Sequence, residues 1–570
     1  MLIERLIWIL ASLSATALAS PILQAPLVDD DAEDGKIGAV SCENEICSRI
    51  GTDVLLKGGN AADSLVATQL CVGVTSLHHS GIGGGGFMII RDSDGTKEFV
   101  DFREMAPAAA FRDMFDGNRN GSIFGGSASG VPGEIRGLQY LHEKYGKLPW
   151  KELVLPSVKV ARDGWQLGHD LERAMNEAVV AYGFDFFTND ASWATDFAPN
   201  GIKLVAGDAI TRSRYANTLE QIAQRGPDAF YEGPIAESMI RAMKEANGTM
   251  TMQDLKNYRV NSRKLFTTDY RGFKVSSGSL PSSGPVVLST LNLLNLYDDF
   301  FSIDSTNLST HRMDEAIRFG YAMRTRLGDP DYVKGMNEYQ EYMLSEETAR
   351  KHHDDISDIH TRNITFYESI EYFNDDDHGT THVVTADSTG MAISMTSSVN
   401  LLFGSTLMVP ETGVVMNNVM DDFSIPGEPN KFGFPPSPAN FITPGKRPLS
   451  STSASIIERA DGSLYFVTGA AGGSRIITST LNTIINIIDR NMSVLEALAE
   501  PRLHDQLMPN LLVLEETFDR ATAEFMQNRG HEVVFIPTAQ SAAQALRLHE
   551  NGTFEAASEV RQKDSAGLVV

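Results

Sequence analysis

The order of hydrophobic and polar residues predicts mixed secondary structure in the first part of the chain. The run at Lys36–Val40 has the pattern of a first strand. Apolar residues recur at helical spacing through Asn60–His78, which predicts a buried helix. From Phe87 to Asp101, two apolar runs flank a Ser-Asp-Gly turn, which is typical of a β-hairpin. Helical patterns dominate from Leu138 to about Ala246 and from Thr310 to Lys351.

Strand patterns return in the second part of the chain. The predicted strands are Thr381–Asp387, Met391–Ser397, Ser453–Arg459, Leu464–Thr468 and Val533–Pro537, and the predicted helices are Ile476–Asp489 and Val494–Ala499. Two blocks of strands separated by helices indicate layered sheets covered by helices. Periodicity alone leaves α/β and α+β classes open. Because no Pro/Gly/Ser-rich linker and no internal repeat divides the 570 residues, we expect one continuous core.

Composition narrows the possible partners. Hydrophobic residues make up 42% and charged residues 21%, which are ordinary globular values. The formal net charge of −26 argues against nucleic-acid or anionic-membrane binding, because both need basic surfaces. It does not exclude an anionic substrate, since a local arginine can receive an anion on an acidic protein.

The N-terminus predicts a secretory route. Residues 1–19 combine a short charged start, an apolar run and the small-x-small site Ala17-Leu18-Ala19, as in a cleaved signal peptide. An uncleaved anchor is the alternative. Secreted or extracellular protein is the first expectation, with vacuolar or membrane-anchored protein as alternatives. Six Asn-x-Ser/Thr sequons are candidate glycosylation sites: Asn120, Asn247, Asn307, Asn363, Asn491 and Asn551.

Candidate chemistry centres on the sequence His-Gly-Thr-Thr-His at 378–382, which follows an acidic run. If the chain is cut between Gly379 and Thr380, Thr380 gains a free α-amine beside its hydroxyl. Such an amine has an unperturbed pKa of about 7.7–8.0 and can act as the base for its own hydroxyl. Taken alone, the same residues also suit an ordinary hairpin after a loop.

Other chemical patterns are weaker. Residues 81–86 match GxGxxG, with Asp101 further on, but a helix precedes the glycines and a hairpin follows them, the reverse of a dinucleotide site. We expect these glycines to allow close packing and positive φ values. The clusters at His352-His353 and Asp375–His378 lack metal-ligand spacing and are interpreted as solvated acidic loops. No GxSxG elbow is present, and lone histidines such as His382 and His504 are more often structural.

Several blocks together carry a family resemblance. They are DFREMAP at Asp101–Pro107, SGVPGE at Ser129–Glu134, YRGFKV and PSSGP within Tyr270–Pro285, NNVMDDFS at Asn417–Ser424, PGKRPLSS at Pro444–Ser451 and GAAGGS at Gly469–Ser474. In order and spacing they resemble the gamma-glutamyltransferase family, and Gly-Thr-Thr-His lies where that family cleaves itself. The resemblance implies an α+β fold, the four-layer αββα sandwich of N-terminal-nucleophile hydrolases. It also implies a large subunit of residues 20–379 and a small catalytic subunit of residues 380–570, held together as a heterodimer.

The resemblance also implies site residues. Arg103, Ser450 and Ser451 would bind the α-carboxylate of a γ-glutamyl group, while Asn400 and Asp422 would accept from its ammonium. Backbone N–H groups of Gly472 and Gly473 would form the oxyanion hole. Ser398 stands where the family has a Thr that hydrogen-bonds the nucleophile Thr380. Val419 departs from the pattern, because the family has Glu or Gln there and valine accepts no hydrogen bond. Cys47 and Cys71 match a pair bridged in animal members, which leaves Cys42 over.

The expected activity is transfer of the γ-glutamyl group of glutathione or a related donor to water, an amino acid or a dipeptide. No cofactor and no metal is expected. Two alternatives stay open: another N-terminal-nucleophile amidase, similar to cephalosporin acylases, and an unprocessed secreted protein that binds amino-acid-like ligands. Testing glutaryl against γ-glutamyl amides separates the first alternative from γ-glutamyl transfer.

Overall fold

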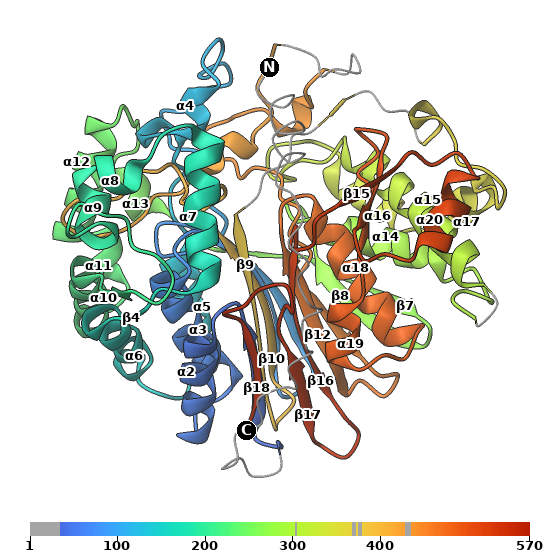
Figure 1. Cartoon of the computed structure of the whole chain (residues 1–570), viewed down its shortest axis with the longest axis horizontal. Helices are drawn as coiled ribbons and strands as arrows, with labels where there is room; N and C mark the ends of the chain where they lie inside the picture. Colours follow the sequence, from blue (N-terminus) through green and yellow to red (C-terminus); the bar gives the residue numbers. More distant parts are fainter. Residues whose placement is uncertain (1–34, 303–304, 368–371, 374–378, 428–434) are drawn as a thin grey trace.

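Two stacked antiparallel sheets form the centre of the molecule (Figure 1). The computed structural model describes residues 35–302, 305–367, 372–373, 379–427 and 435–570. The expected signal peptide and the Asp375–His378 cluster therefore lie outside the described residues. Within the described part of the chain, none of the helices has both the length and the apolar character that a membrane crossing requires.

The first sheet has seven strands. In spatial order they are β18 (Ala566–Val569), β1 (Gly38–Cys42), β9 (Thr380–Asp387), β10 (Ala392–Ser398), β2 (Gly85–Arg91), β3 (Lys97–Asp101) and β6 (Asn261–Arg263). The second sheet has six: β17 (Phe554–Ala557), β16 (Ala542–Leu548), β12 (Leu464–Ala471), β11 (Ser455–Glu458), β8 (Phe273–Gly278) and β7 (Leu265–Tyr270). Smaller sheets comprise β13 (Leu503–His504), β14 (Leu512–Glu515) and β15 (Val533–Ile536), and β4 (Trp165–Gln166) with β5 (Ala209–Ile210).

Helices cover the outer face of each sheet. The first sheet is covered from α2 (Glu45–Leu56), α3 (Ala61–Thr75), α4 (Asn120–Ile123), α5 (Glu134–Tyr145), α6 (Trp150–Asp163), α7 (His169–Tyr182), α8 (Phe186–Asn189), α9 (Ala191–Phe197), α10 (Ser213–Arg225), α11 (Asp228–Tyr231), α12 (Pro234–Glu245) and α13 (Met252–Asn257). The second is covered from α14 (Gly284–Leu294), α15 (Thr306–Arg324), α16 (Met336–Met343), α17 (Glu346–Asp355), α18 (Arg475–Ile488), α19 (Val494–Ala499) and α20 (Arg520–Gln527). The expected four-layer αββα sandwich is confirmed.

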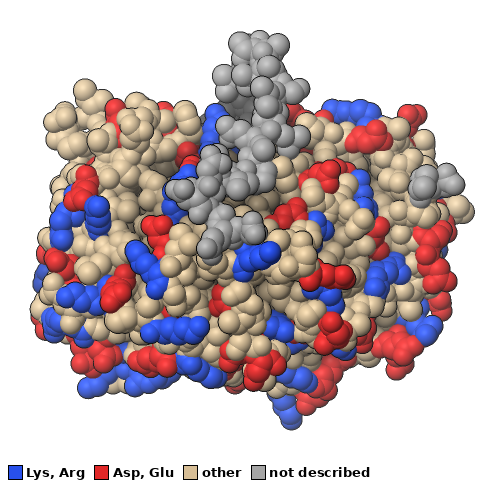
Figure 2. Space-filling model, turned by 90° about the horizontal axis from the view of Figure 1, so that it is seen from below, with Lys and Arg blue, Asp and Glu red and all other residues tan. Residues whose placement is uncertain are grey.

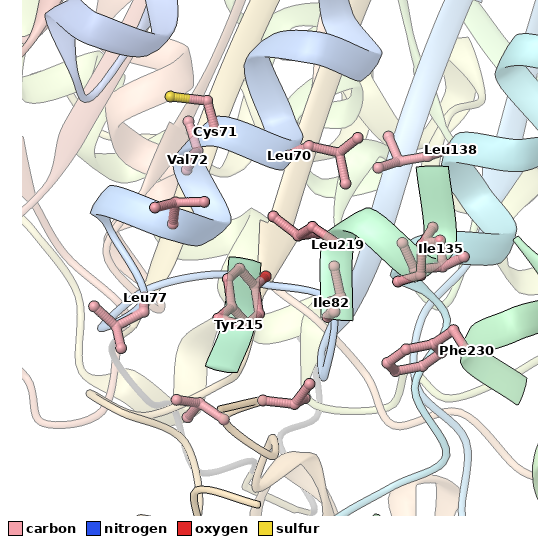
Figure 3. Packing of buried hydrophobic residues seen from close by; sticks show 14 of the residues in the cluster. Leu70, Cys71, Val72, Leu77, Ile82, Ile135, Leu138, Tyr215, Leu219 and Phe230 are labelled. Atoms are coloured by element: carbon pink, nitrogen blue, oxygen red, sulfur yellow. The ribbon is translucent and has the colours of Figure 1, made fainter. Parts of the chain in front are cut away.

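Apolar layers lie between the two sheets and on the outer side of each sheet. Phe87, Ile456 and Leu546 belong to the cluster between the two sheets. Residues of α3, α5 and α10 form the core outside the first sheet, as Figure 3 shows for Leu70, Val72, Ile135, Leu138, Tyr215 and Leu219. Because strand residues meet helices on one face and a sheet on the other, every residue of β10 is buried. This explains why the central strands are apolar or small on both faces.

The structure corrects three details of the sequence analysis. The first strand is Gly38–Cys42 rather than Lys36–Val40. The glycines of residues 81–86 have no positive φ. They serve close packing alone: a Cβ on Gly86 would lie 2.0 Å from the Thr396 carbonyl oxygen. His352 and His353 lie on α17 rather than in a loop, and His352 is buried with its ring stacked on Phe319.

The structure shows the cysteine pair and the sequon asparagines that the sequence analysis associated with a secretory route. Cys47 and Cys71 form the expected disulfide between α2 and α3, and Cys42 is a buried free thiol. Five of the sequon asparagines are exposed, whereas Asn307 is half-buried and accepts a hydrogen bond from Thr522 Oγ1 at 2.7 Å. On the face that Figure 2 shows, positive and negative side chains are interspersed.

Candidate active site

Thr380 is the first residue of β9, beside the centre of the seven-stranded sheet. The antiparallel register places it directly opposite Ser398 of β10, and Ser398 is in turn opposite Gly85 of β2. Thr380 Oγ1 donates to Ser398 Oγ at 3.3 Å. The strand pairing therefore fixes the position of the threonine hydroxyl.

The Ser398 hydroxyl joins the groups on both sides of the expected cleavage site. It donates to the Gly379 carbonyl oxygen at 2.7 Å and accepts from the Asn400 backbone N–H at 2.7 Å. Because one hydroxyl has a single proton, the contact with Thr380 is one in which Ser398 accepts. The arrangement polarises the carbonyl that immediately precedes Thr380.

Gly379 has a backbone that side chains do not tolerate. Its φ is +151°, and a Cβ there would lie 2.3 Å from the Asn400 carbonyl oxygen. Only glycine brings the carbonyl this close to Ser398 without displacing the neighbouring chain.

Arg103 reaches the site from the segment after β3. Its backbone N–H donates to Asp101 Oδ1 at 2.9 Å, and its carbonyl accepts from the Tyr258 hydroxyl at 2.8 Å. Its guanidinium, only 4% exposed, forms an ion pair with Asp422. Among the residues that the structure describes, the buried Nε of Arg103 has no hydrogen-bond partner. A buried arginine thus retains a donor for a further anion.

Asp422 and Asn400 occupy the other side of the site. Asp422 ends a short 3-10 helix, η3 (Val419–Asp422). Asn400 has a φ of +82°, and its Nδ2 donates to the Asn418 carbonyl at 3.1 Å. Asn418 also holds this turn through its Oδ1, which accepts from the Leu401 N–H at 2.9 Å.

Ser450 and Ser451 are held beside an arginine that the sequence did not indicate. Arg324, the last residue of α15, donates from Nη2 to Ser451 Oγ at 2.9 Å and from Nε to Ser283 Oγ at 3.3 Å. Ser283 in turn donates to the Ser450 carbonyl at 2.7 Å. Ser283 belongs to the PSSGP block, which was the only available signal. Arg324 itself has no motif around it.

The glycine pair lies between β12 and α18. Gly472 and Gly473 have φ values of +123° and +60°, so neither suits another residue. A Cβ on Gly472 would lie 2.9 Å from the Gln540 carbonyl oxygen. The first turn of α18 follows directly, and a helix N-terminus favours negative charge. The position suits backbone donors directed at an oxyanion.

The structure brings the expected residues together around one pocket. Its lining residues are Gly86, Arg103, Arg324, Thr380, Thr396, Ser398, Asn400, Asp422, Leu449, Ser450, Ser451, Thr452, Gly473 and Ile476. Gly472 lies next to this lining. The strands, the 3-10 helix and the end of α15 come from distant parts of the sequence, so the pocket exists only in the folded chain.

Two buried carboxyl groups adjoin the site. Burial raises the pKa of Glu104 to about 7, against the attraction of Arg103. Burial also raises the pKa of Glu134 to about 8, and its Oε2 accepts from the Ser397 hydroxyl at 2.8 Å. Glu104 lies in the block DFREMAP and Glu134 in SGVPGE, but no pattern in these blocks indicated a role for either residue.

Val419 lies within the wall rather than in the pocket. Its side chain is fully buried, and a Cβ added to Gly130 would lie 2.4 Å from its Cγ1. His382 is likewise structural: its ring hydrogen-bonds Thr396 Oγ1 at 2.8 Å, and burial lowers its pKa to about 3. His504 hydrogen-bonds Thr478 Oγ1 at 2.9 Å.

Comparison with known proteins gives the class and then the family. The fold is that of N-terminal-nucleophile hydrolases: a cephalosporin acylase from Bacillus halodurans matches with a TM-score of 0.82 and 22% identity over 97% of this chain and 98% of that one. A gamma-glutamyltranspeptidase from Helicobacter pylori matches with a TM-score of 0.52 and 29% identity over 60% of this chain and 94% of that one.

The sequence comparisons are more specific. The family model of gamma-glutamyltranspeptidase matches residues 47–569. A glutathione hydrolase proenzyme from Arthroderma benhamiae is 51% identical, over 100% of this chain and 99% of that protein. The chain belongs to the gamma-glutamyltranspeptidase family.

Proposed function

We propose that this protein is a γ-glutamyl acyltransferase and glutathione hydrolase whose nucleophile is Thr380, released by self-cleavage after Gly379. The large subunit would be residues 20–379 and the small subunit residues 380–570. The observation that carries the proposal is a single pocket that contains the Thr380 hydroxyl and a buried Arg103–Asp422 ion pair.

Self-cleavage follows from the contacts of Ser398. Thr380 Oγ attacks the Gly379 carbonyl carbon, and its proton passes to Ser398 while the Ser398 proton moves toward the developing oxyanion. The C–N bond then breaks, and the nitrogen of Thr380 takes up the proton that had moved to the oxyanion. An ester now joins Gly379 to Thr380 Oγ. Water hydrolyses the ester, which gives a Gly379 carboxylate and a Thr380 with a free amine and hydroxyl.

The charged pair supports a γ-glutamyl donor. An α-amino acid head group carries a carboxylate and an ammonium side by side, which complements the guanidinium of Arg103 and the carboxylate of Asp422. Ser451, held by Arg324, supplies a further donor for the carboxylate. A glutaryl group has the carboxylate but no ammonium, so it offers Asp422 no contact beyond the ion pair with Arg103. The pair therefore favours γ-glutamyl donors over the glutaryl amides of the acylase alternative.

Acyl transfer proceeds in two steps. Thr380 Oγ attacks the γ-carbonyl while its own amine takes the proton, and the N–H groups near Gly472 and Gly473 stabilise the oxyanion. The leaving amine takes the proton and departs, which is cysteinylglycine for glutathione. Water, an amino acid or a dipeptide then accepts the γ-glutamyl group. No step requires a metal or a cofactor.

We place the protein in the secretory pathway, with extracellular release as the first expectation and a vacuolar destination as the second. The disulfide and the exposed sequons Asn120, Asn247, Asn363 and Asn551 support this route. Asn491 is also exposed, whereas Asn307 is the least accessible acceptor.

The test has two stages. A denaturing gel with N-terminal sequencing should give two fragments, one of which begins Thr-Thr-His-Val at Thr380. A single intact chain would refute the Thr380 mechanism and favour the ligand-binding alternative. Activity is then measured with paired γ-glutamyl and glutaryl anilides.

Arg103→Lys should lower kcat/KM for the γ-glutamyl anilide about 10–100-fold, since a charge-assisted hydrogen bond contributes about 1.5–3 kcal/mol. Arg112→Lys, at an exposed arginine, is the matched control and should behave as wild type. Preference of the wild-type enzyme for the glutaryl anilide would favour the acylase alternative.

A further inference from the structure

A second polar cluster lies in the helical layer outside the six-stranded sheet. His311 and Glu315 are four residues apart on α15, and His531 follows α20. The two helices lie side by side at the right of Figure 1. All three residues are buried, and one nitrogen or oxygen atom of each lies within 4.8 Å of the others. None of the three lines the pocket of Thr380.

Outer partners determine where the histidine protons reside. His311 Nε2 lies 2.7 Å from the Ser357 carbonyl oxygen, so this nitrogen donates. His531 Nδ1 faces Asp314 Oδ2 at 2.9 Å, although at an angle outside that of a regular hydrogen bond. A neighbouring carboxylate favours the proton on that nitrogen. The two inner nitrogens, His311 Nδ1 and His531 Nε2, are then both acceptors.

These two inner nitrogens are only 2.8 Å apart. Two lone pairs at this distance repel each other unless a positive charge joins them. A proton on His531 Nε2 or a bound cation would remove this repulsion.

The surrounding charge also favours a divalent cation. Asp314, Glu315 and Asp505 are buried with Arg318 as their counter-charge, and Arg318 NH1 contacts Asp505 Oδ2 at 2.7 Å. Three carboxyl groups thus share one guanidinium. Within the described part of the chain, both carboxylate oxygens of Asp314 lack a hydrogen-bond partner. Glu315 is oriented by the Tyr367 hydroxyl, which donates to it at 2.8 Å.

We propose that His311 Nδ1, His531 Nε2 and a Glu315 carboxylate oxygen bind a divalent cation of the zinc type. Two imidazoles and a carboxylate are ligands that zinc accepts, at about 2.0–2.2 Å. Tetrahedral ligands at that distance lie roughly 3.3 Å from one another. The 2.8 Å between the imidazole nitrogens and the 4.0 Å from His531 Nε2 to Glu315 Oε1 lie on either side of this value.

The outer partners match those of known zinc sites. A metal-bound histidine usually donates its other N–H to a carboxylate or a backbone carbonyl. His311 does so toward the Ser357 carbonyl, and His531 Nδ1 faces the Asp314 carboxylate at 2.9 Å. The cation would be structural, since the proposed reaction does not involve it. On the proposed cleavage, it would join α15 of the large subunit to the His531 segment of the small subunit.

Metal uptake tests the site directly. The purified full-length protein is stripped with a chelator, equilibrated with one equivalent of Zn²⁺ per chain and assayed for bound metal. Wild type should retain about one Zn²⁺ per chain, and Co²⁺ should give the visible absorption of a tetrahedral site. The double variant His311→Asn/His531→Asn should lose both signals. The matched control His353→Asn/His549→Asn, outside the cluster, should keep them.

A further variant distinguishes metal binding from packing. Asp314→Asn should weaken zinc affinity about 10–100-fold, because it replaces the carboxylate that faces His531 Nδ1 by a neutral amide. Thr380→Ala should bind zinc like wild type even though it cannot cleave itself, so the result does not depend on the proposed activity. If stripped wild-type protein takes up no metal above background, the proposal is wrong and a shared proton joins the two histidines. That result stands even if the double variant fails to fold.

Discussion

Replacing Ser398 by alanine tests the proposed self-cleavage most directly. The Ser398 hydroxyl donates to the Gly379 carbonyl at 2.7 Å and accepts from Thr380 Oγ1 at 3.3 Å. Alanine removes both contacts without adding bulk. Loss of one donor to a developing oxyanion typically costs about 10²–10³ in rate, or about 2.7–4 kcal/mol. We therefore expect Ser398→Ala to cleave itself about 10²–10³ times more slowly.

The assay follows the loss of full-length precursor on denaturing gels after synthesis in a cell-free system. Ser398→Thr keeps the hydroxyl and should cleave within a few-fold of wild type. Ser397→Ala is the matched control, because the Ser397 hydroxyl is directed to Glu134 at 2.8 Å, away from Gly379. A thermal melt verifies folding, since Ser398→Ala also leaves the Asn400 N–H unpaired, at a cost of about 1–3 kcal/mol. A folded Ser398→Ala precursor that matures at the wild-type rate would refute the relay.

Three further results are expected. Gly379→Ala should leave the precursor uncleaved, because its Cβ would lie 2.3 Å from a backbone oxygen. Gly462→Ala, which also has a positive φ (+85°) but nothing within 4 Å, should lose some stability and still mature. Arg324→Met should raise KM for γ-glutamyl donors about 10–100-fold and change kcat less, because Ser451 loses its 2.9 Å donor. In a cleavage-deficient chain, Glu134→Gln should flatten the pH dependence of stability. The pKa of Glu134 is raised by burial from 4.5 to about 8, so wild type should lose about 1.4 kcal/mol per unit as pH rises through that window in thermal or urea unfolding.

Local patterns predicted the elements that have strong periodicity or clear turns. The helix at Ala61–Thr75, the hairpin of β2 and β3, and the strands β9 and β10 were expected within three residues. The edge strands β17 and β18 and the neighbouring strand β16 were missed, because runs such as Ala542–Leu548 mix alanine and glutamine without clear alternation. Their pairing is also remote in sequence: β18 at the C-terminus pairs with β1.

The site residues also divide into those that a sequence motif predicts and those that only the fold brings together. Thr380, Arg103 and Asp422 lie in motifs and were expected. Arg324 was not, because nothing near the end of α15 distinguishes it from a surface arginine; only the fold brings it to Ser451. The His311–His531 contact has the same origin, since it joins residues 220 positions apart.

The strand order of the seven-stranded sheet also determines how the mature molecule can be denatured. On the proposed cleavage, β9, β10 and β18 belong to the small fragment, while β1, β2, β3 and β6 belong to the large one. The large-fragment strand β1 lies between β18 and β9, so the two sets are interleaved. Folding of the precursor is then unimolecular and independent of concentration. After cleavage, any refolding requires two separate polypeptides to meet and to interdigitate their strands, which makes it bimolecular. The lifetime of the mature enzyme would therefore be set by how slowly it unfolds rather than by an equilibrium.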